Sequence, residues 1–341
     1  MSTALVARLD SVGDVLITGP AVRAVAAAHD RTVFLAGPRG SAAAGLLPAV
    51  DRVIEWAAAW VDFDAPQLTA DDVSRLVGLI AEERPDTVLI FTSFHQSPLP
   101  LALICRMAGV PWIGATCEDY PGTLLDLRHR VDELIPEPER ALSLAAAAGF
   151  ALPPGDDGRL RLRTLDPLPA DVAADIGPGG YVAFHPAAAV PARQPSADRC
   201  AGMVRALRAA GHRVVVTGTA ADRTRTAHVA GDAALDIAGR TTLGQLATVF
   251  AGAAAVVAPN TGPAHLAAAV GAPVVSLFAP VVPAAKWAPY GTPVVVLGDQ
   301  RAPCRDTRAR ACPVPGHPCL DGITDQDVVA AVAAVRDRGA A

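Results

Sequence analysis

The sequence predicts an α/β protein of two lobes, each with a parallel sheet covered by helices, and a cleft between the lobes. Short β-rich runs alternate with Ala- and Leu-rich helical stretches from end to end, a pattern typical of parallel sheets with helices on both faces. The alternation breaks once and then restarts. With 341 residues, 51% of them hydrophobic, the chain is long enough for two domains with their own cores.

In the first half, strands are predicted at 4–9, 32–36 and 87–91. A helix is predicted over 15–28, where Val15, Ile17, Val22 and Val25 recur at roughly helical spacing. We expect each strand to be joined to the next by a right-handed crossover.

The break lies at 152–180, a polar segment punctuated by prolines and glycines. We therefore predict an N-terminal domain over 1–165 and a C-terminal domain over 166–341. After the break the pattern predicts strands at 181–185, 213–217, 254–258 and 274–278, and helices at 196–210, 243–251 and 263–270. Ligands of such sheets bind beyond the carboxyl ends of the strands, so functional residues are expected in the loops that follow strands.

Charge and hydropathy narrow the class of partner. The formal net charge is -5, from 29 basic and 34 acidic residues, which gives no electrostatic reason to expect nucleic acid or an anionic membrane. Arg8 and Asp10 interrupt the first apolar run, so no signal peptide is predicted and a cytoplasmic protein is expected. The longest nearly uncharged stretch, 264–285, contains three prolines, so no transmembrane helix is predicted.

The six cysteines are expected to be free thiols, since the cytosol keeps thiols reduced. Cys304, Cys312, His317 and Cys319 lie in one Pro- and Arg-rich loop and suggest zinc. Their spacing is much longer than the C-x₂₋₄-C pairs of structural zinc sites, which favours buried thiols in an ordered loop. No metal site is predicted.

The sharpest local signal is the segment 258–265, APNTGPAH, which follows a buried strand and precedes a helix. Asn260 or Thr261 suits the N-cap, Pro263 suits the first turn, and Gly262 lets a ligand approach the backbone. Free N–H groups and the helix dipole make such a terminus a site for a phosphate. A well-made helix start without a ligand explains the same residues.

A second strand-to-helix turn, DSVGD, spans 10–14. It lacks the G-x-G-x-x-G fingerprint and the P-loop lysine, so nucleotide binding there has weak support. Asp14 suits a favourable charge near the helix dipole. Facing an interdomain cleft, the same carboxylate would accept a proton from a hydroxyl.

Two further loops carry charged residues after strands. Arg193 follows the strand that ends at His185, where it suits either a diphosphate or a solvated surface position. Asp222 follows the next strand and suits either ribose hydroxyls or a helix cap. No G-x-S-x-G elbow is present, so a hydrolase triad is not predicted.

Taken in order, several segments resemble glycosyltransferase family 9, the ADP-heptose heptosyltransferases. The matching segments are RLDSVGDVLITGP at 8–20, HPAAA at 185–189, GHRVVVTG at 211–218, IAGRTTL at 237–243 and NTGPAHLAAAVGAP at 260–273. The late cysteine loop, 304–319, is also similar to one that many members carry. The resemblance spans nearly the whole chain and is least diagnostic between about 40 and 150.

The resemblance implies a fold of the GT-B type, with two Rossmann-like domains whose parallel sheets face a central cleft. The N-terminal domain would bind the acceptor and the C-terminal domain the nucleotide sugar. It further implies an inverting, metal-independent transfer, with no cofactor beyond the nucleotide-sugar donor. Nucleic acid and integral membrane association are not expected, whereas peripheral membrane contact is compatible with this class.

By similarity, Asp14 occupies the position of the general base, with Asp10, Ser11 and Gly13 beside it on the acceptor side. The backbone of Thr261 and Gly262 would hold the leaving diphosphate. The donor-binding set implied by the resemblance is His185, Arg193, Asp222, Thr241, Asn260, Thr261, Gly262, His265 and Lys286. Within it, Asp222 would lie near the ribose and the backbone around Thr241 near the base.

Three departures from the family pattern stand out. Asn260 replaces a usual aspartate that can touch the donor sugar, and Asp10 replaces a frequent serine. Ala192-Arg193-Gln194 replaces a common Lys-Arg-Trp run, so Arg193 or Lys286 must stand in for the phosphate-binding lysine.

We therefore expect transfer of a heptose, or a related sugar, from ADP-heptose to a hydroxyl of an envelope glycan or of a secondary metabolite such as an aminoglycoside. A nucleotide-sugar epimerase of the same architecture and a catalytically inactive nucleotide-sugar-binding module remain as alternatives.

Overall fold

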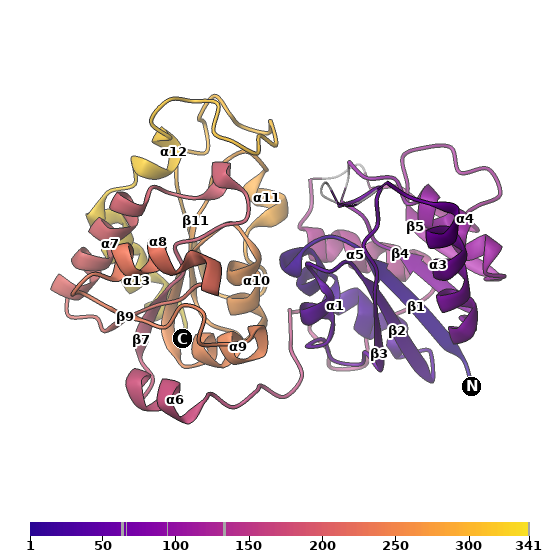
Figure 1. Ribbon diagram of the computed structural model, residues 1–341, viewed down its shortest axis with the longest axis horizontal. Coiled ribbons are helices and arrows are strands. Elements are labelled where there is room, and N and C mark those ends of the chain that lie inside the picture. Colours follow the sequence, from indigo (N-terminus) through magenta and orange to yellow (C-terminus); the bar gives the residue numbers. More distant parts are fainter. Residues whose placement is uncertain (63–64, 66, 94, 132–133, 340–341) are drawn as a thin grey trace. The chain divides into compact units, whose positions relative to one another are not determined.

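The computed structural model describes residues 1–62, 65, 67–93, 95–131 and 134–339 (Figure 1). The chain divides into two compact units, Met1–Arg163 (unit 1) and Thr164–Ala341 (unit 2). Each unit contains a six-stranded sheet in which every strand pair is parallel. The predicted α/β class with two parallel sheets is confirmed.

The sheet of unit 1 has the strand order β3-β2-β1-β4-β5-β6. Its strands are β1 (Thr3–Arg8), β2 (Arg31–Ala36), β3 (Arg52–Glu55), β4 (Thr87–Ile90), β5 (Trp112–Thr116) and β6 (Leu127–His129). Its helices are α1 (Val12–Ala26), α2 (Ser41–Ala44), α3 (Ala70–Glu83), α4 (Leu99–Met107) and α5 (Glu137–Ala147). The chain runs from β1 outward to β3, then returns to pair β4 with the other side of β1. The sheet therefore has a switch point between β1 and β4, the place where such sheets bind ligands.

Helices cover both faces of this sheet. Leu5 and Ala7 of β1 join a buried cluster with Leu76 and Ile80 of α3 and Leu101 of α4. Because successive side chains of a strand point to opposite faces, the other face of β1 lies toward the α1 and α5 side. Helices α1 and α5 pack against each other there, as Figure 1 shows. Because helices cover both faces of β1, packing on both sides holds the carboxyl end of this strand in place.

The loop after β2 approaches that carboxyl end closely. A Cβ added at Gly37 would lie 2.2 Å from the carbonyl oxygen of Leu9, the residue before Asp10. We expect Gly37→Ala to lower the free energy of unfolding by about 1–3 kcal/mol, because one of two backbone segments must move. Gly78, inside α3, has nothing within 4 Å of the corresponding position. Gly78→Ala should stabilise the protein by about 1 kcal/mol, since alanine favours helix.

Chemical denaturation followed by circular dichroism measures both glycine variants. Opposite signs for the two Gly→Ala changes are the expected result. Equal effects at both positions would show that the contact between Gly37 and Leu9 does not constrain the turn.

The sheet of unit 2 has the strand order β12-β11-β10-β7-β8-β9. Its strands are β7 (Tyr181–Phe184), β8 (Val214–Val216), β9 (Leu235–Asp236), β10 (Ala253–Pro259), β11 (Val274–Leu277) and β12 (Val294–Leu297). Its α-helices are α6 (Ala170–Ile176), α7 (Ala197–Ala209), α8 (Arg223–Ala230), α9 (Leu243–Ala251), α10 (Gly262–Ala269), α11 (Ala284–Trp287), α12 (Pro318–Asp321) and α13 (Asp325–Gly339), with 3₁₀ turns η1 (Pro191–Arg193) and η2 (Ala220–Asp222). The switch point of this sheet lies between β7 and β10.

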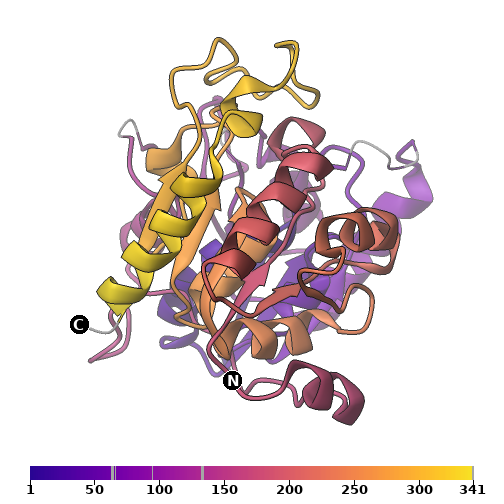
Figure 2. The ribbon, with the colours of Figure 1, turned by 90° about the vertical axis from the view of Figure 1, so that its left-hand side faces the viewer.

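One face of this sheet is covered by α7, α8 and α13. Figure 2 shows α13 and α7 lying side by side across it. Their apolar side chains, among them Met203, Leu207 and Val332, pack with Phe184 and Val257 of the strands.

In both units, no helix among the described residues has the length and apolarity to cross a bilayer.

Candidate active site

The switch point of unit 1 carries a buried group of charges. Arg8, the last residue of β1, is 2% exposed. Its Nε lies 2.7 Å from Oδ2 of Asp10, and its NH2 donates a 3.0 Å hydrogen bond to Oδ1 of Asp14. One guanidinium is thus shared by two carboxylates, one from the β1–α1 turn and one from the first turn of α1.

Asp14 also takes part in the start of α1. Ser11 occupies the N-cap, and its hydroxyl and backbone N–H donate to Oδ2 of Asp14 at 2.6 and 3.2 Å. The carboxylate therefore serves the helix terminus that the sequence suggested. It is also held by Arg8 from the other side, which a plain capping role does not require.

The loop after β4 supplies contacts that sequence reasoning missed. Ser93 accepts a 2.9 Å hydrogen bond from NH2 of Arg8 and donates one of 3.3 Å to Oδ2 of Asp10. The Gln96 amide donates to Oδ1 of Asp10. A small cavity of about 10 Å³, lined by Leu9, Trp60, Gln96 and other residues of this loop region, lies beside these contacts and is too small for a sugar.

Helix α5 adds two more charges. Arg140 donates from NH1 to the carbonyl of Thr92 at 2.8 Å and lies 3.4 Å from Oε2 of Glu137. Both side chains are buried. No local pattern in the sequence pointed to them, because α5 lies over 40 residues beyond the loop that it contacts.

The electrostatics of this group are set by burial and by the shared guanidinium. Burial raises the pKa of Asp10, against the opposing effect of Arg8, and the charge of Asp14 raises it further. Burial works against the charge of Arg8, yet Asp10 and Asp14 outweigh it and raise the pKa of Arg8. The arginine is therefore a fixed positive charge beside Asp14.

In unit 2, loops after β7 and β10 meet at the second switch point. Arg193 is half-buried in η1, and its NH1 lies 3.4 Å from the carbonyl oxygen of Asn260. The sequence left a solvated arginine open, but the side chain lies against the end of β10. Thr261 and Gly262 follow at the start of α10, and His265 is buried within its first turns.

Asn260 does not cap α10, which corrects one of the two caps that the sequence suggested. Its side chain exchanges two hydrogen bonds with the backbone of Ala279, at 3.3 and 3.1 Å. Thr261 occupies the N-cap position without a side-chain cap bond. The backbone after β11 competes for the amide, so Asn260 ties the ends of β10 and β11 together.

The other predicted donor-binding residues are spread along the same edge. Asp222 accepts hydrogen bonds from Thr219 at 2.8 and 2.6 Å, the local capping arrangement that the sequence left open. Thr241 lies between β9 and α9, and Lys286 lies in α11. That Thr241 and Lys286 lie in one donor site with Arg193 and Asn260 remains a prediction.

His185 directly follows β7 as a buried side chain, with Nδ1 3.0 Å from the hydroxyl of Thr217. Burial lowers the pKa of His185 to about 4, from an ordinary 6.5. Between these values the unfolded chain binds a proton that the folded chain excludes. Stability should therefore fall by about 1.4 kcal/mol per pH unit as the pH drops through this window, and His185 should have no such effect above it.

Denaturation at about pH 7 and about pH 5 tests this pH dependence. We expect the wild-type protein to lose about 2 kcal/mol more than His185→Gln over that interval. Equal losses would show that the imidazole takes up a proton in the folded state.

The cysteine loop, 304–319, supports the Arg193 segment. The Ala192 N–H donates to the Arg310 carbonyl at 2.9 Å, and Nε2 of His317 lies 3.1 Å from the Ala192 carbonyl. All six cysteines are free thiols, as predicted. Burial, with a contribution from Cys304, raises the pKa of Cys319 to about 12. Within the described ranges, no group of three or more His, Cys, Asp or Glu residues is placed to hold a metal ion.

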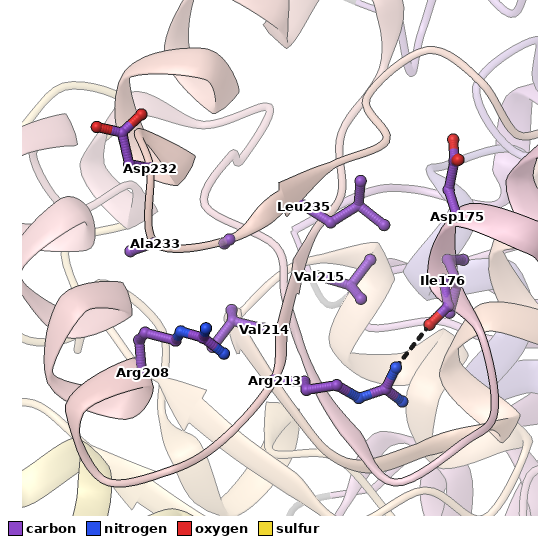
Figure 3. A pocket seen from close by; sticks show the side chains of 10 residues that line it. Asp175, Ile176, Arg208, Arg213, Val214, Val215, Asp232, Ala233 and Leu235 are labelled. Carbon is purple, nitrogen blue, oxygen red and sulfur yellow. Dashed lines mark hydrogen bonds between the residues drawn. The ribbon is translucent and has the colours of Figure 1, made fainter.

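A pocket of unit 2 lies at the amino ends of the strands, and Figure 3 shows the side chains that line it. It has a volume of about 250 Å³ and is lined by residues at the end of α6, by residues just before or at the start of β8 and β9, and by Arg208 from α7. Arg213 donates to the carbonyls of Ile176 at 2.8 Å and Gly179 at 3.2 Å, and so braces the loop before β7. This position is at the amino ends of the strands, away from the switch point.

Solved structures share the whole fold. The ADP-heptose LPS heptosyltransferase II of E. coli is 20% identical, with both chains fully covered and a TM-score of 0.75. A family 9 glycosyl transferase from Veillonella parvula is 16% identical, with 99% and 98% of the chains covered and a TM-score of 0.80. E. coli heptosyltransferase WaaC, solved with ADP-2-deoxy-2-fluoro heptose, is 21% identical, with 96% and 97% covered and a TM-score of 0.69.

These likenesses confirm the GT-B fold class, that of two-unit glycosyltransferases. The model of glycosyltransferase family 9 (heptosyltransferase) matches residues 95–316, about two thirds of the chain. The chain therefore belongs to this family and is a glycosyltransferase. A search of curated proteins finds no match.

Proposed function

We propose that the protein transfers a heptose from ADP-heptose to an acceptor hydroxyl with inversion at the anomeric carbon. The proposal is carried by the Asp14 carboxylate, which lies at the switch point of unit 1 between Ser11 and Arg8. Family membership supports the class of reaction. One solved relative, E. coli heptosyltransferase WaaC, is described both with ADP and with ADP-2-deoxy-2-fluoro heptose, and this supports the choice of donor.

In this mechanism Asp14 takes the proton of the acceptor hydroxyl. The acceptor oxygen forms a bond to the anomeric carbon from the face opposite the diphosphate. The bond between that carbon and the phosphate oxygen breaks, and the electron pair leaves with ADP. Attack from the opposite face inverts the configuration.

Unit 2 would hold the leaving diphosphate. The start of α10 offers the backbone N–H groups of Thr261 and Gly262, and Arg193 adds a positive charge beside Asn260. Negative charge on the diphosphate grows as the sugar bond breaks, so these groups stabilise the transition state more than the bound donor. No step in this scheme requires a metal.

Calorimetric titration with ADP, UDP, GDP and ADP-heptose, with and without EDTA, tests the donor. Preferential binding of ADP and ADP-heptose that EDTA does not change is the expected result. Absence of binding by all four would overturn the donor site. A requirement for metal would overturn metal independence alone.

A screen of acceptor hydroxyls then tests transfer itself. Envelope glycans and aminoglycosides are the two classes to compare, with ADP release and the anomeric configuration of the product as readouts. Donor binding without transfer to any acceptor would favour a binding module.

A further inference from the structure

We propose that Arg8 and Asp10 are positioning residues that together set the proton affinity of Asp14, with Asp10 competing against Asp14 for the single Arg8 guanidinium. This inference rests on the proposed role of Asp14 for its place in the reaction. Its physical content concerns the buried charges alone.

One buried guanidinium contacts two carboxylates. Arg8 contacts Asp10 at 2.7 Å through Nε and Asp14 at 3.0 Å through NH2, so one planar group faces both carboxylates. Both side chains of the Arg8–Asp10 pair are at most 10% exposed. Solvent therefore screens their interaction little. A change in the contact between Arg8 and Asp10 directly changes the electrostatic effect of Arg8 on Asp14.

Asp10 is itself held in place by the loop after β4. Ser93 and the Gln96 amide donate to its carboxylate, and Ser93 also accepts from Arg8. These contacts hold Asp10 at Nε of Arg8, whereas Asp14 is held at NH2. Burial and the charge of Asp14 raise the pKa of Asp10, whereas Arg8 and the hydrogen bonds from Gln96 and Ser93 oppose that rise and favour its negative charge beside Asp14.

Charged side chains from several elements of unit 1 act on Arg8, which holds Asp14. Strand β1 and the turn supply Arg8 and Asp10, and helix α5 supplies Glu137 and Arg140. Among the described residues of the loop after β4, the titratable side chain is that of His95, which has an electrostatic or hydrogen-bond partner of its own. Glu137 and Arg140 pair with each other and act on Arg8 in opposite directions, because Glu137 attracts the guanidinium and Arg140 repels it.

A favourable opposite charge makes a carboxylic acid release its proton more readily, and a nearby like charge has the reverse effect. Arg8 therefore keeps Asp14 ready to accept a proton, while Asp10 prevents Asp14 from becoming too weak a base. Serine at position 10 would leave Arg8 wholly to Asp14. We expect the aspartate in this chain to make Asp14 a stronger base than a serine would.

The test is carbon NMR titration of the full-length protein labelled at the aspartate carboxyl carbon. The Asp14 signal is assigned by its loss in Asp14→Asn. Arg8→Met should raise the titration midpoint of Asp14 by about one pH unit or more, and Arg8→Lys should restore most of the difference. Asp10→Asn and Asp10→Ser should both lower the midpoint.

Midpoints that agree in wild type, Arg8→Met and Asp10→Asn would overturn the inference. Circular dichroism establishes that each variant is folded, and if Arg8→Met does not fold, the two Asp10 variants decide the matter. The titration does not depend on activity. A shifted midpoint without any sugar transfer by the wild-type protein would contradict the proposed function and leave this inference standing.

Discussion

Asp14→Asn is expected to lower turnover by about a hundredfold or more while donor affinity changes only a few-fold. Asparagine has nearly the same shape but cannot accept the acceptor proton. The amide nitrogen of asparagine cannot accept a hydrogen bond, so the contacts with Ser11 and Arg8 cannot both be kept. A modest loss of stability is therefore expected as well. Turnover, donor affinity and unfolding are therefore measured on the same variant.

Asp72 provides a matched control for the role of Asp14 in the helix. It sits at the same position of a capping box at the start of α3, where Oδ2 accepts from Thr69 at 2.7 and 3.2 Å. Asp72→Asn should lower stability by a similar amount and leave turnover unchanged. If both variants lose turnover in proportion to their loss of stability, Asp14 is a capping residue and not the base.

Arg193→Ala should weaken binding of ADP-heptose by about 1.5–3 kcal/mol, which is a rise in Kd of roughly 10- to 150-fold. The guanidinium lies against the Asn260 carbonyl, next to the start of α10, where a diphosphate would replace solvent around it. Arg193→Lys should recover only part of the loss, because lysine lacks the planar pair of donors. Titration calorimetry gives these constants.

Arg208 is the matched control for Arg193. It belongs to the same unit but lines the pocket at the amino ends of the strands. Arg208→Ala should leave Kd unchanged. An unchanged Kd in Arg193→Ala, or equal weakening in both variants, would remove Arg193 from the donor site.

The strands and helices, and approximately where they begin and end, were predictable from the sequence because apolar periodicity is a local signal. The strands at 4–9 and 181–185 are found at Thr3–Arg8 and Tyr181–Phe184, and the loops after them carry the two charged groups. The placement of Asp14 in a helix start followed from the same local pattern.

What escaped prediction depends on residues far apart in the chain. Ser93 reaches Arg8 across 85 positions, and neither residue carries a local mark of that contact. Asn260 does not cap α10, because its amide hydrogen-bonds to the backbone of Ala279 instead. Ala279 lies near only because β10 pairs with β11. Which side chains meet across a sheet depends on the order of its strands, and apolar periodicity does not determine that order.

The strand order also has a consequence for synthesis of the chain. In each unit the first strand to emerge, β1 or β7, pairs on one side with early neighbours and on the other with its fourth strand, β4 or β10. The Arg8–Ser93 contact requires the residues after β4, and the Arg193–Asn260 contact requires the residues after β10. Each of these contacts therefore forms only after the fourth strand of its unit and the loop that follows it have been made. A chain released early would hold its acidic turn, with Asp10 and Asp14, beside an open strand edge, in the form most exposed to aggregation and proteolysis.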